Sequence, residues 1–261
     1  MSLPPIFFHK FPLPLPYART LALQERVHSL QLAQRKLDNS HKDILLLLEH
    51  RPVYTAGRRQ TEESVSDERN RLLSIGADFV RTNRGGELTY HGPGQIVGYP
   101  LLDLSRYTPA MGIRDYICRM QTTIGRHLRE AHQIEPVPSD NTGVFLNPVT
   151  KVASIGVQIR HRLTTHGFSL NVTKEPLAWF DRVVACGLAD VKAGSIETAT
   201  GVSVDLNAEI DGFVGRFGRA YGREMVQLDV DQEGEIGQEI RDVEEEAQRA
   251  GDWARKPTGE S

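Results

Sequence analysis

The spacing of apolar side chains along the chain predicts helices and strands in alternation. Apolar positions recur at intervals of three and four over residues 17–37, 111–132 and 210–221, which predicts three long helices. The unbroken apolar run over residues 44–48 predicts a strand buried on both faces, and alternation predicts another strand over residues 151–160. Weaker patterns predict a short helix over 67–75 and strands over 78–81, 96–104, 143–146 and 165–172.

Because these strands lie between long helices without strict strand–helix alternation, the fold class predicted is α+β, a mixed β-sheet flanked by helices. The chain has 261 residues, enough for one large domain. Its longest apolar run has five residues, far short of the about 18 that a membrane span needs. Five prolines in the first 16 residues exclude an amphipathic targeting helix there, and this segment is expected to be extended.

The formal net charge of −3 conceals two different regions. Residues 1–228 carry 27 Lys and Arg against 23 Asp and Glu, whereas residues 229–261 carry 4 against 11. We therefore divide the chain into a body of +4, residues 1–228, and an acidic C-terminal extension of −7, residues 229–261. The extension is expected to be a solvated helix in part or a disordered polar tail, with no chemistry of its own.

A glycine-rich stretch over residues 84–95 is the first candidate for chemistry. It contains Gly85, Gly86, Gly92 and Gly94, and glycine lets backbone N–H groups approach a phosphate, a carboxylate or an oxyanion closely. The spacing matches neither the dinucleotide-binding nor the P-loop motif, so nucleotide binding is not indicated. A hairpin loop that needs glycine for positive φ is the alternative.

Two cysteines exclude a disulfide framework and leave one candidate nucleophile. Cys118 lies inside a patterned helix and is expected to be a core residue. Cys186, followed by glycine in VVACGL, is either a small buried side chain or a nucleophile that needs a base or a cation to become thiolate. Candidates for that partner stand at predicted strand ends: Lys151, His50, His91 and His166.

Lys151 allows two interpretations, a solvated strand end or a partly desolvated amine that exchanges a proton with the thiol. The histidines come without HExxH, CxxC or a close carboxylate pair, so no metal site is predicted. Arginines are numerous in the body, but no aromatic-interleaved basic stripe accompanies them, so no nucleic-acid binding is predicted.

Taken in order, six segments of the chain resemble the lipoyl(octanoyl) transferase family. These are EHRPVYTAGRR from Glu49, NRGGELTYHGPGQIVGYPLLDL from Asn83, TGVF from Thr142, KVASIGVQIR from Lys151, THGFSLNV from Thr165 and ACGL from Ala185. The resemblance implies the catalytic fold of the biotin and lipoate protein ligases. It also implies transfer of an octanoyl group from acyl carrier protein, through a cysteine thioester, to a lysine of a lipoyl domain.

Residue by residue, the resemblance implies that Cys186 is the acyl-thioester nucleophile and Lys151 the lysine that tunes it. His50 and His166 are implied to support the site. Tyr90, Val152, Ile155 and Phe168 are expected as walls of the acyl tunnel. The full set implied to bind the acyl substrate is Arg84, Gly85, Gly86, Glu87, Leu88, Thr89, Tyr90, His91, Ser154, Ile155, Gly156, Gly167, Phe168 and Ser169.

Two features depart from the bacterial members of the family. Ala185 stands where they commonly have proline before the cysteine, and the acidic extension has no counterpart in the short bacterial chains. The first departure bears on the geometry of the loop, and the second concerns no catalytic residue. Both look more like a eukaryotic member, so the mitochondrial matrix is expected if the source is eukaryotic and the cytoplasm if it is bacterial.

The expected partners follow from the resemblance: octanoyl-acyl carrier protein as donor, and as acceptors the lipoyl domains of 2-oxoacid dehydrogenase complexes and the glycine cleavage H protein. No cofactor, neither ATP nor metal, is expected, and neither are nucleic-acid or membrane partners; a monomer is expected. Three alternatives stay open: an ATP-dependent lipoate or biotin ligase of the same fold, a Cys-His amidohydrolase, and a silent module that binds the carrier.

Overall fold

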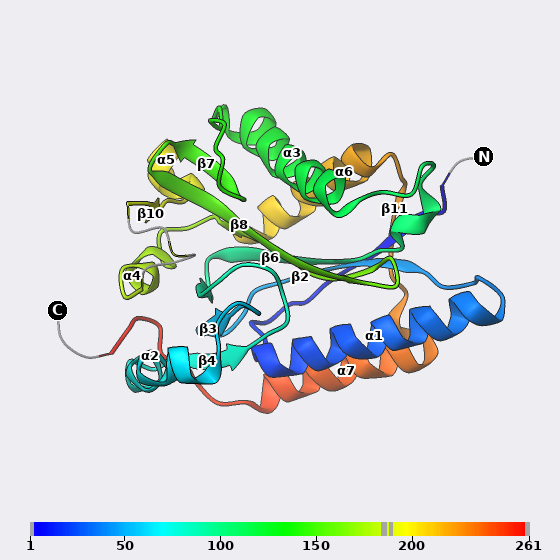
Figure 1. Ribbon diagram of the computed structural model, residues 1–261, viewed down its shortest axis with the longest axis horizontal. Coiled ribbons are helices and arrows are strands. Elements are labelled where there is room, and N and C mark those ends of the chain that lie inside the picture. Colours follow the sequence, from blue (N-terminus) through cyan, green and yellow to red (C-terminus); the bar gives the residue numbers. More distant parts are fainter. Residues whose placement is uncertain (1–2, 184–186, 188–189, 259–261) are drawn as a thin grey trace.

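The computed structural model describes residues 3–183, 187 and 190–258 and shows a large and a small β-sheet with helices around them (Figure 1). The strands of the large sheet are β1 (Ile6–Lys10), β2 (Asp43–Leu48), β6 (Gln95–Leu101), β7 (Val144–Asn147), β8 (Thr150–Arg160), β9 (Leu163–Asn171), β10 (Lys192–Ala193) and β11 (Met225–Gln227). Those of the small sheet are β3 (Val53–Ala56), β4 (Asp78–Arg81) and β5 (Thr89–His91).

The helices are α1 (Tyr17–Leu37), α2 (Glu62–Ser74), α3 (Ile113–His132), α4 (Leu177–Phe180), α5 (Ile196–Thr200), α6 (Leu206–Tyr221) and α7 (Gly234–Arg249). Short 3₁₀ turns cover Leu104–Arg106 and Val230–Gln232. None of these described helices is both long enough and apolar enough to cross a membrane.

The large sheet is mixed and lies between two helical layers. Its order is β10-β8-β9-β6-β2-β1-β11, with β7 added to β8; β1 pairs in parallel with β2 and β11, whereas β6 is antiparallel to both β2 and β9. Helices α3 and α6 cover one face, and α1 and α7 cover the other (Figure 1). The predicted α+β class with a mixed sheet flanked by helices is therefore confirmed.

Strand β2 explains why the run over residues 44–48 has no polar positions. Ile44, Leu46 and Leu48 pack into the apolar cluster shared with α1 and α7, while Leu45 and Leu47 face the cluster of α3 and α6. Since successive side chains of a strand point to opposite faces, a central strand covered on both sides needs apolar residues throughout.

The long helices agree with the spacing of the apolar residues. Helix α1 spans the predicted residues 17–37, and α3 begins two residues after the predicted start at 111. Helix α6 is capped by Asp205, whose carboxylate accepts a hydrogen bond from the Asn207 N–H at 2.8 Å. On α3, Met120 and Ile124 are fully buried. Cys118 precedes Met120 by two positions, about 200° around the helix, and is exposed, so its prediction as a core residue is wrong.

Other boundaries differ where local capping outweighs apolar spacing. Helix α2 begins at Glu62 rather than at residue 67, because the Thr61 hydroxyl accepts a hydrogen bond from the Ser64 N–H and acidic side chains occupy the first turn. Strands β3 and β5, which form most of the small sheet, were not predicted. Each has only three or four residues, too few for a visible period.

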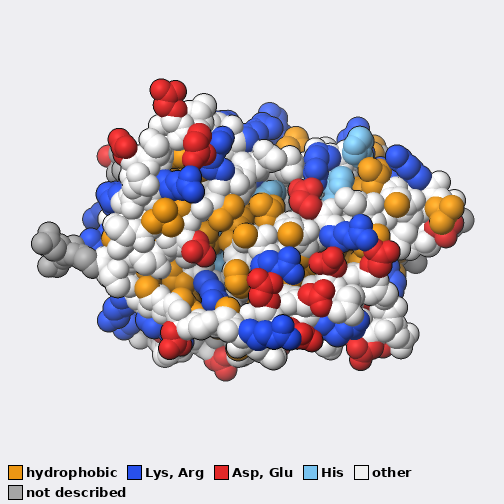
Figure 2. All heavy atoms as spheres, turned by 90° about the horizontal axis from the view of Figure 1, so that it is seen from below, with side chains coloured by type: hydrophobic (Ala, Val, Ile, Leu, Met, Phe, Trp, Pro, Cys, Tyr) orange, Lys and Arg blue, Asp and Glu red, His pale blue; other side chains and the backbone are white. Residues whose placement is uncertain are grey.

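The acidic C-terminal residues form part of the core. Ile236, Ile240, Val243 and Ala247 of α7 are buried against the large sheet and α1. On the surface seen from below, acidic and basic side chains alternate (Figure 2), and two of the ion pairs join α7 to α1: Glu246 with Arg19, and Glu235 with Arg26. The expected helix is confirmed for residues 234–249, but it packs against the core rather than being solvated, and two of its carboxylates pair with arginines of α1.

Candidate active site

A small cavity lies where β8 and β9 meet the glycine-rich loop and β5. Its volume is about 40 Å³ and its walls are mainly apolar. Segments far apart in the sequence contribute to it: the start of α1, the loop over residues 84–86, and strands β5, β6, β8 and β9. We call it the inner pocket; it is lined by Tyr17, Arg84, Gly86, Thr89, His91, Tyr99, Ser154, Ile155, Gly156, His166, Gly167, Phe168 and Ser169.

The pairing of β8 with β9 brings two of the predicted segments face to face. The antiparallel register sets Ser154 opposite Ser169, Ile155 opposite Phe168, and Gly156 opposite Gly167. Three consecutive residues of one strand thus face three consecutive residues of the other, and all six line the inner pocket. Antiparallel pairing therefore assembles this wall from two motifs that the sequence keeps apart.

The glycine-rich loop lies directly on β8. A Cβ at Gly156 would stand 2.9 Å from the Gly85 carbonyl oxygen, closer than real Cβ contacts occur, so only glycine permits this approach. The Gly85 N–H donates to the Val157 carbonyl at 3.1 Å and fixes the loop there. Gly86, with φ of +91°, turns the chain back toward β5.

Arg84 is buried and holds the loop against the small sheet. Its guanidinium donates to the Thr55 carbonyl at 2.5 Å, to the Thr55 hydroxyl at 2.8 Å and to the Glu87 carbonyl at 2.8 Å. Burial lowers the pKa of both His91 and His166, and the positive charge of Arg84 lowers them further. Thr55, which positions Arg84, was not among the predicted site residues.

Strand β5 separates the residues of the TYH motif between two faces. Thr89 and His91 line the inner pocket, whereas the Tyr90 ring stacks on Trp179 at a centroid distance of 5.4 Å in the core of the small sheet. Leu88 belongs to that core as well. Tyr90 was expected as a tunnel wall, and the alternation of a strand turns it away from the pocket. Val152, also expected as a wall, lies in the core shared with α3 and α6.

Two buried histidines, His91 and His166, line the inner pocket and a third, His50, lies behind its wall; burial keeps all three uncharged. It lowers the pKa of His50 to about 4 and that of His166 to about 3, and it holds the pKa of His91 well below its usual range. His50 Nδ1 donates to the Leu15 carbonyl at 3.0 Å, so its Nε2 is unprotonated and accepts from the Tyr99 hydroxyl at 2.5 Å. His50 thus stands behind the pocket wall rather than in it.

His166 is held in an unusual conformation. Its φ is +60°, which is rare for a residue other than glycine, and its N–H donates to the Gln24 side chain of α1 at 2.7 Å. Its Nδ1 is 3.4 Å from the Tyr17 hydroxyl. Neither Tyr17 nor Tyr99 was predicted: both lack a motif that marks them, although Tyr99 belongs to the quoted segment that begins at Asn83.

A larger surface groove of about 480 Å³, the outer groove, opens beside the inner pocket. The two share Gly86, Ile155 and Gly156 in their walls, so they adjoin each other. Lys151 lies in the outer groove, half-buried at the start of β8, with its Nζ 5.7 Å from the centre of the Phe145 ring. Gly85, Glu87, Arg58 and Arg59 border the same groove.

Glycine at position 143 leaves room for the lysine. A Cβ there would stand 2.4 Å from Lys151 Cε, and Gly143 has φ of +137°. This accounts for the TGVF segment that precedes β8. Cys186 lies outside the described residues; its described neighbour Gly187 lies so close to Glu87 that a Cβ would stand 2.3 Å from the carboxylate.

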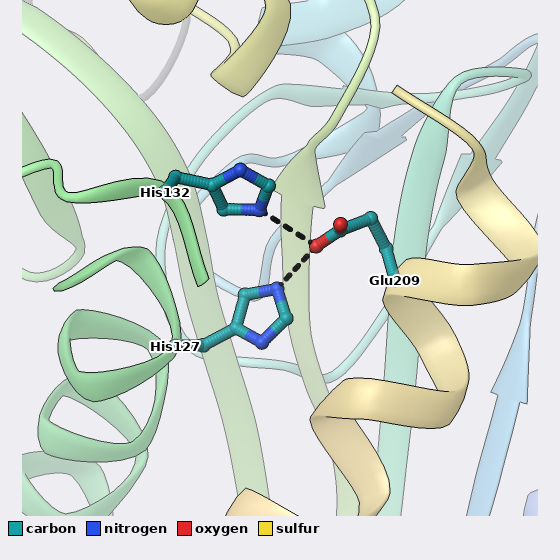
Figure 3. A group of neighbouring side chains, drawn as sticks. All are labelled: His127, His132 and Glu209. Atoms are coloured by element: carbon teal, nitrogen blue, oxygen red, sulfur yellow. Dashed lines mark hydrogen bonds and ion pairs between the residues drawn. The ribbon is translucent and has the colours of Figure 1, made fainter. Parts of the chain in front are cut away.

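Among the residues that the structure describes, one group of side chains could hold a metal ion, and it lies at the C-terminal end of α3 (Figure 3). The Nε2 atoms of His127 and His132 are 2.7 and 2.8 Å from the same Glu209 oxygen, which are hydrogen-bond distances. The His127 Nδ1 is buried without a hydrogen-bond partner, whereas a metal-bound imidazole normally donates its second N–H to an acceptor. The geometry therefore fits hydrogen bonds that join α3 to α6 better than a metal centre.

Comparison with known proteins places this geometry among lipoate enzymes. Residues 16–218 match the family described as lipoyl protein ligase A/B catalytic domain. An octanoyltransferase of Caldicellulosiruptor saccharolyticus is 35% identical over 208 residues, 79% of this chain and 85% of its own. The octanoyl-[acyl-carrier-protein]:protein N-octanoyltransferase LIPT2, mitochondrial, of Danio rerio is 40% identical over 160 residues, 60% of this chain and 69% of its own.

The same fold occurs in a solved structure of low sequence identity. A bi-partite lipoate protein ligase from Thermoplasma acidophilum, studied with its E2 lipoyl domain, is 14% identical to this chain. The two superimpose with a TM-score of 0.63 over 100% of this chain and 99% of the other.

Proposed function

The chain belongs to the lipoyl protein ligase A/B catalytic domain family and is an octanoyltransferase, and we propose that it carries the octanoyl group as a thioester on Cys186. The donor is octanoyl-acyl carrier protein, and the acceptor is a lysine of a lipoyl domain. One observation carries the proposal: the apolar-walled inner pocket adjoins the groove that holds Lys151, in a chain whose relatives are named octanoyltransferases. Such a pocket suits an aliphatic chain, and the groove outside suits the thioester and the carrier.

In the first half-reaction, the Cys186 thiol loses its proton to Lys151 and attacks the carbonyl carbon of the octanoyl thioester. The C–S bond to the carrier breaks, and the carrier's thiolate leaves with the proton that Lys151 returns. Because burial keeps His50, His91 and His166 uncharged, they supply no positive charge to a thiolate. Lys151 is therefore the residue proposed for both the proton transfer and the charge.

A tetrahedral oxyanion forms in each half-reaction and needs N–H donors. The Gly85 N–H is occupied by the Val157 carbonyl, and Gly156 lies within the β8–β9 ladder. Gly86, next along the same loop, borders both the inner pocket and the outer groove. We assign the Gly86 N–H as a donor to the oxyanion.

In the second half-reaction, a neutral lysine of the lipoyl domain attacks the Cys186 thioester and gives up a proton, for which Lys151 is again the acceptor. An amide forms, the thioester breaks and the cysteine is regenerated. Exchange of one thioester for another is nearly balanced in free energy and formation of the amide is downhill. The reaction so written needs neither ATP nor a metal.

The proposed macromolecular partners are acyl carrier proteins, the lipoyl domains of 2-oxoacid dehydrogenase complexes and the glycine cleavage H protein. Arg58, Arg59 and Lys151 border the outer groove together with Glu87 and Asp140, and this small excess of positive charge favours acidic carriers. For a eukaryotic source we propose the mitochondrial matrix, and for a bacterial source the cytoplasm; the relative from Danio rerio is named mitochondrial.

Intact-protein mass spectrometry after incubation with octanoyl-acyl carrier protein, without ATP, tests the proposal. The wild-type chain should gain one octanoyl group and pass it to an added lipoyl domain, whereas Cys186→Ser should gain none. Cys118→Ser is the matched control, because Cys118 is exposed on α3, and it should behave as wild type. Acylation of the Cys186→Ser protein would refute the nucleophile, and a requirement for ATP would favour a ligase. Free octanoate without acylated lipoyl domain would favour an amidohydrolase.

A further inference from the structure

The inner pocket has an open side and a closed side. Ile155 and Gly156, which it shares with the outer groove, are half-buried. Tyr17 and Tyr99 line the inner pocket but not the outer groove, and they are only 2% and 3% exposed. An acyl chain that enters from the groove beside Lys151 therefore has buried residues ahead of it, Tyr17 and Tyr99 among them.

The closed side is held firmly in place. The Tyr99 hydroxyl donates to His50 at 2.5 Å, and the Tyr17 ring lies parallel to the His91 ring, with an angle of 8° and 6.0 Å between their centres. Tyr17 is the first residue of α1, and Tyr99 lies in the middle of β6. Side chains packed between a helix and a central strand resist displacement, because a close-packed interior leaves them no free volume.

The closed side is also uncharged at neutral pH. Burial raises the pKa of Tyr17 to about 12 and that of Tyr99 well above its usual range. The neighbouring His166, whose pKa burial lowers to about 3, carries no charge either. An uncharged aromatic surface accepts the methyl end of an aliphatic chain more readily than a carboxylate or an ammonium group.

The pocket is small enough to hold only the end of an acyl chain. A volume of about 40 Å³ holds about three or four water-sized groups, so it takes the methyl end of an octanoyl chain while the remaining carbons extend toward the outer groove. Two further carbons would have to displace a wall ring, and overfilling a packed site is unfavourable.

We propose that the rings of Tyr17 and Tyr99 form the end wall of the acyl pocket and set the longest chain that the enzyme transfers. This inference rests on the octanoyl transfer proposed above. It assigns a specificity-determining role to two residues that carry none of the proton-transfer chemistry, and it places the methyl end of the chain against them.

The test compares transfer of hexanoyl, octanoyl, decanoyl and dodecanoyl groups from acyl carrier protein to a lipoyl domain, by kcat/KM, in the full chain. Tyr17→Leu and Tyr99→Leu should each raise the decanoyl-to-octanoyl ratio by about tenfold or more, since a methylene in an apolar pocket changes kcat/KM by about that factor. Tyr17→Phe keeps the ring and should retain the wild-type ratio. Tyr116→Leu is the matched control, because Tyr116 is fully buried in the core shared with α3 and lines neither pocket nor groove.

The outcomes separate this inference from the proposed function. If the wild-type chain transfers no acyl group, the function fails. If it transfers octanoyl but the folded leucine variants keep the wild-type ratio, or Tyr116→Leu raises it equally, the end wall is refuted. Tyr17→Trp, whose larger ring extends further into the pocket, should shift the preference toward hexanoyl. If circular dichroism shows that the leucine variants are unfolded, this variant tests the end wall, and an unchanged chain-length preference refutes it.

Discussion

Truncation of one side chain on α7 tests whether the acidic C-terminal residues belong to the fold. Ile240 is fully buried between α7, α1 and the large sheet. Ile240→Ala removes three carbon atoms, a loss of roughly 2.5 kcal/mol at about 0.8 kcal/mol each. The cavity left behind adds to it, so we expect unfolding to become easier by about 3–4 kcal/mol, as for other large-to-small changes in cores.

Urea unfolding followed by circular dichroism measures this free energy, and the melting temperature should fall by roughly 6–15 °C. Glu245→Ala is the matched control on the same helix. Its carboxylate is exposed and pairs with Arg249 one turn later at 2.8 Å, an interaction worth about 0.5 kcal/mol or less. If the two variants are equally stable, the apolar face of α7 is not buried, and residues 229–261 are an appendage after all.

Two further predictions concern the pocket. Stability should fall as the pH drops from about 6.5 toward 4, because the unfolded chain binds protons at His50 and His166 near pH 6.5, whereas folding lowers their pKa values to about 4 and about 3. At pH 5 each of the two histidines should lower the free energy of unfolding by roughly 2 kcal/mol. Urea midpoints that do not change between pH 7 and 5 would contradict this prediction. Gly156→Ala places a methyl group 2.9 Å from the Gly85 carbonyl and should lower kcat/KM for octanoyl transfer about tenfold or more. Gly215→Ala, whose Cβ would meet only an arginine side chain at 3.8 Å, should not; equal rates in the two variants would argue against a close loop.

Strand pairing determines how much of the site could be predicted from the sequence. The two segments at Ser154–Gly156 and Gly167–Ser169 are marked by motif, and the structure pairs them across β8 and β9. A motif does not predict the direction of each side chain: Tyr90 stands in the most specific motif, yet it faces the core of the small sheet. The direction of a side chain depends on the register of a three-residue strand, and so short a strand has no period to reveal it.

Periodicity alone determined the helices α1, α3 and α6 and the buried strand β2, because a helix or central strand must place apolar residues where its neighbours cover it. The glycine-rich loop was also evident, since backbone contact excludes any other residue at its closest approach. Tertiary structure alone decided that Tyr17 lines a pocket, that burial keeps three histidines uncharged, and that an acidic helix belongs to the core. Each of these depends on burial by residues distant in the sequence, and apolar spacing records only that a face is covered, never by what.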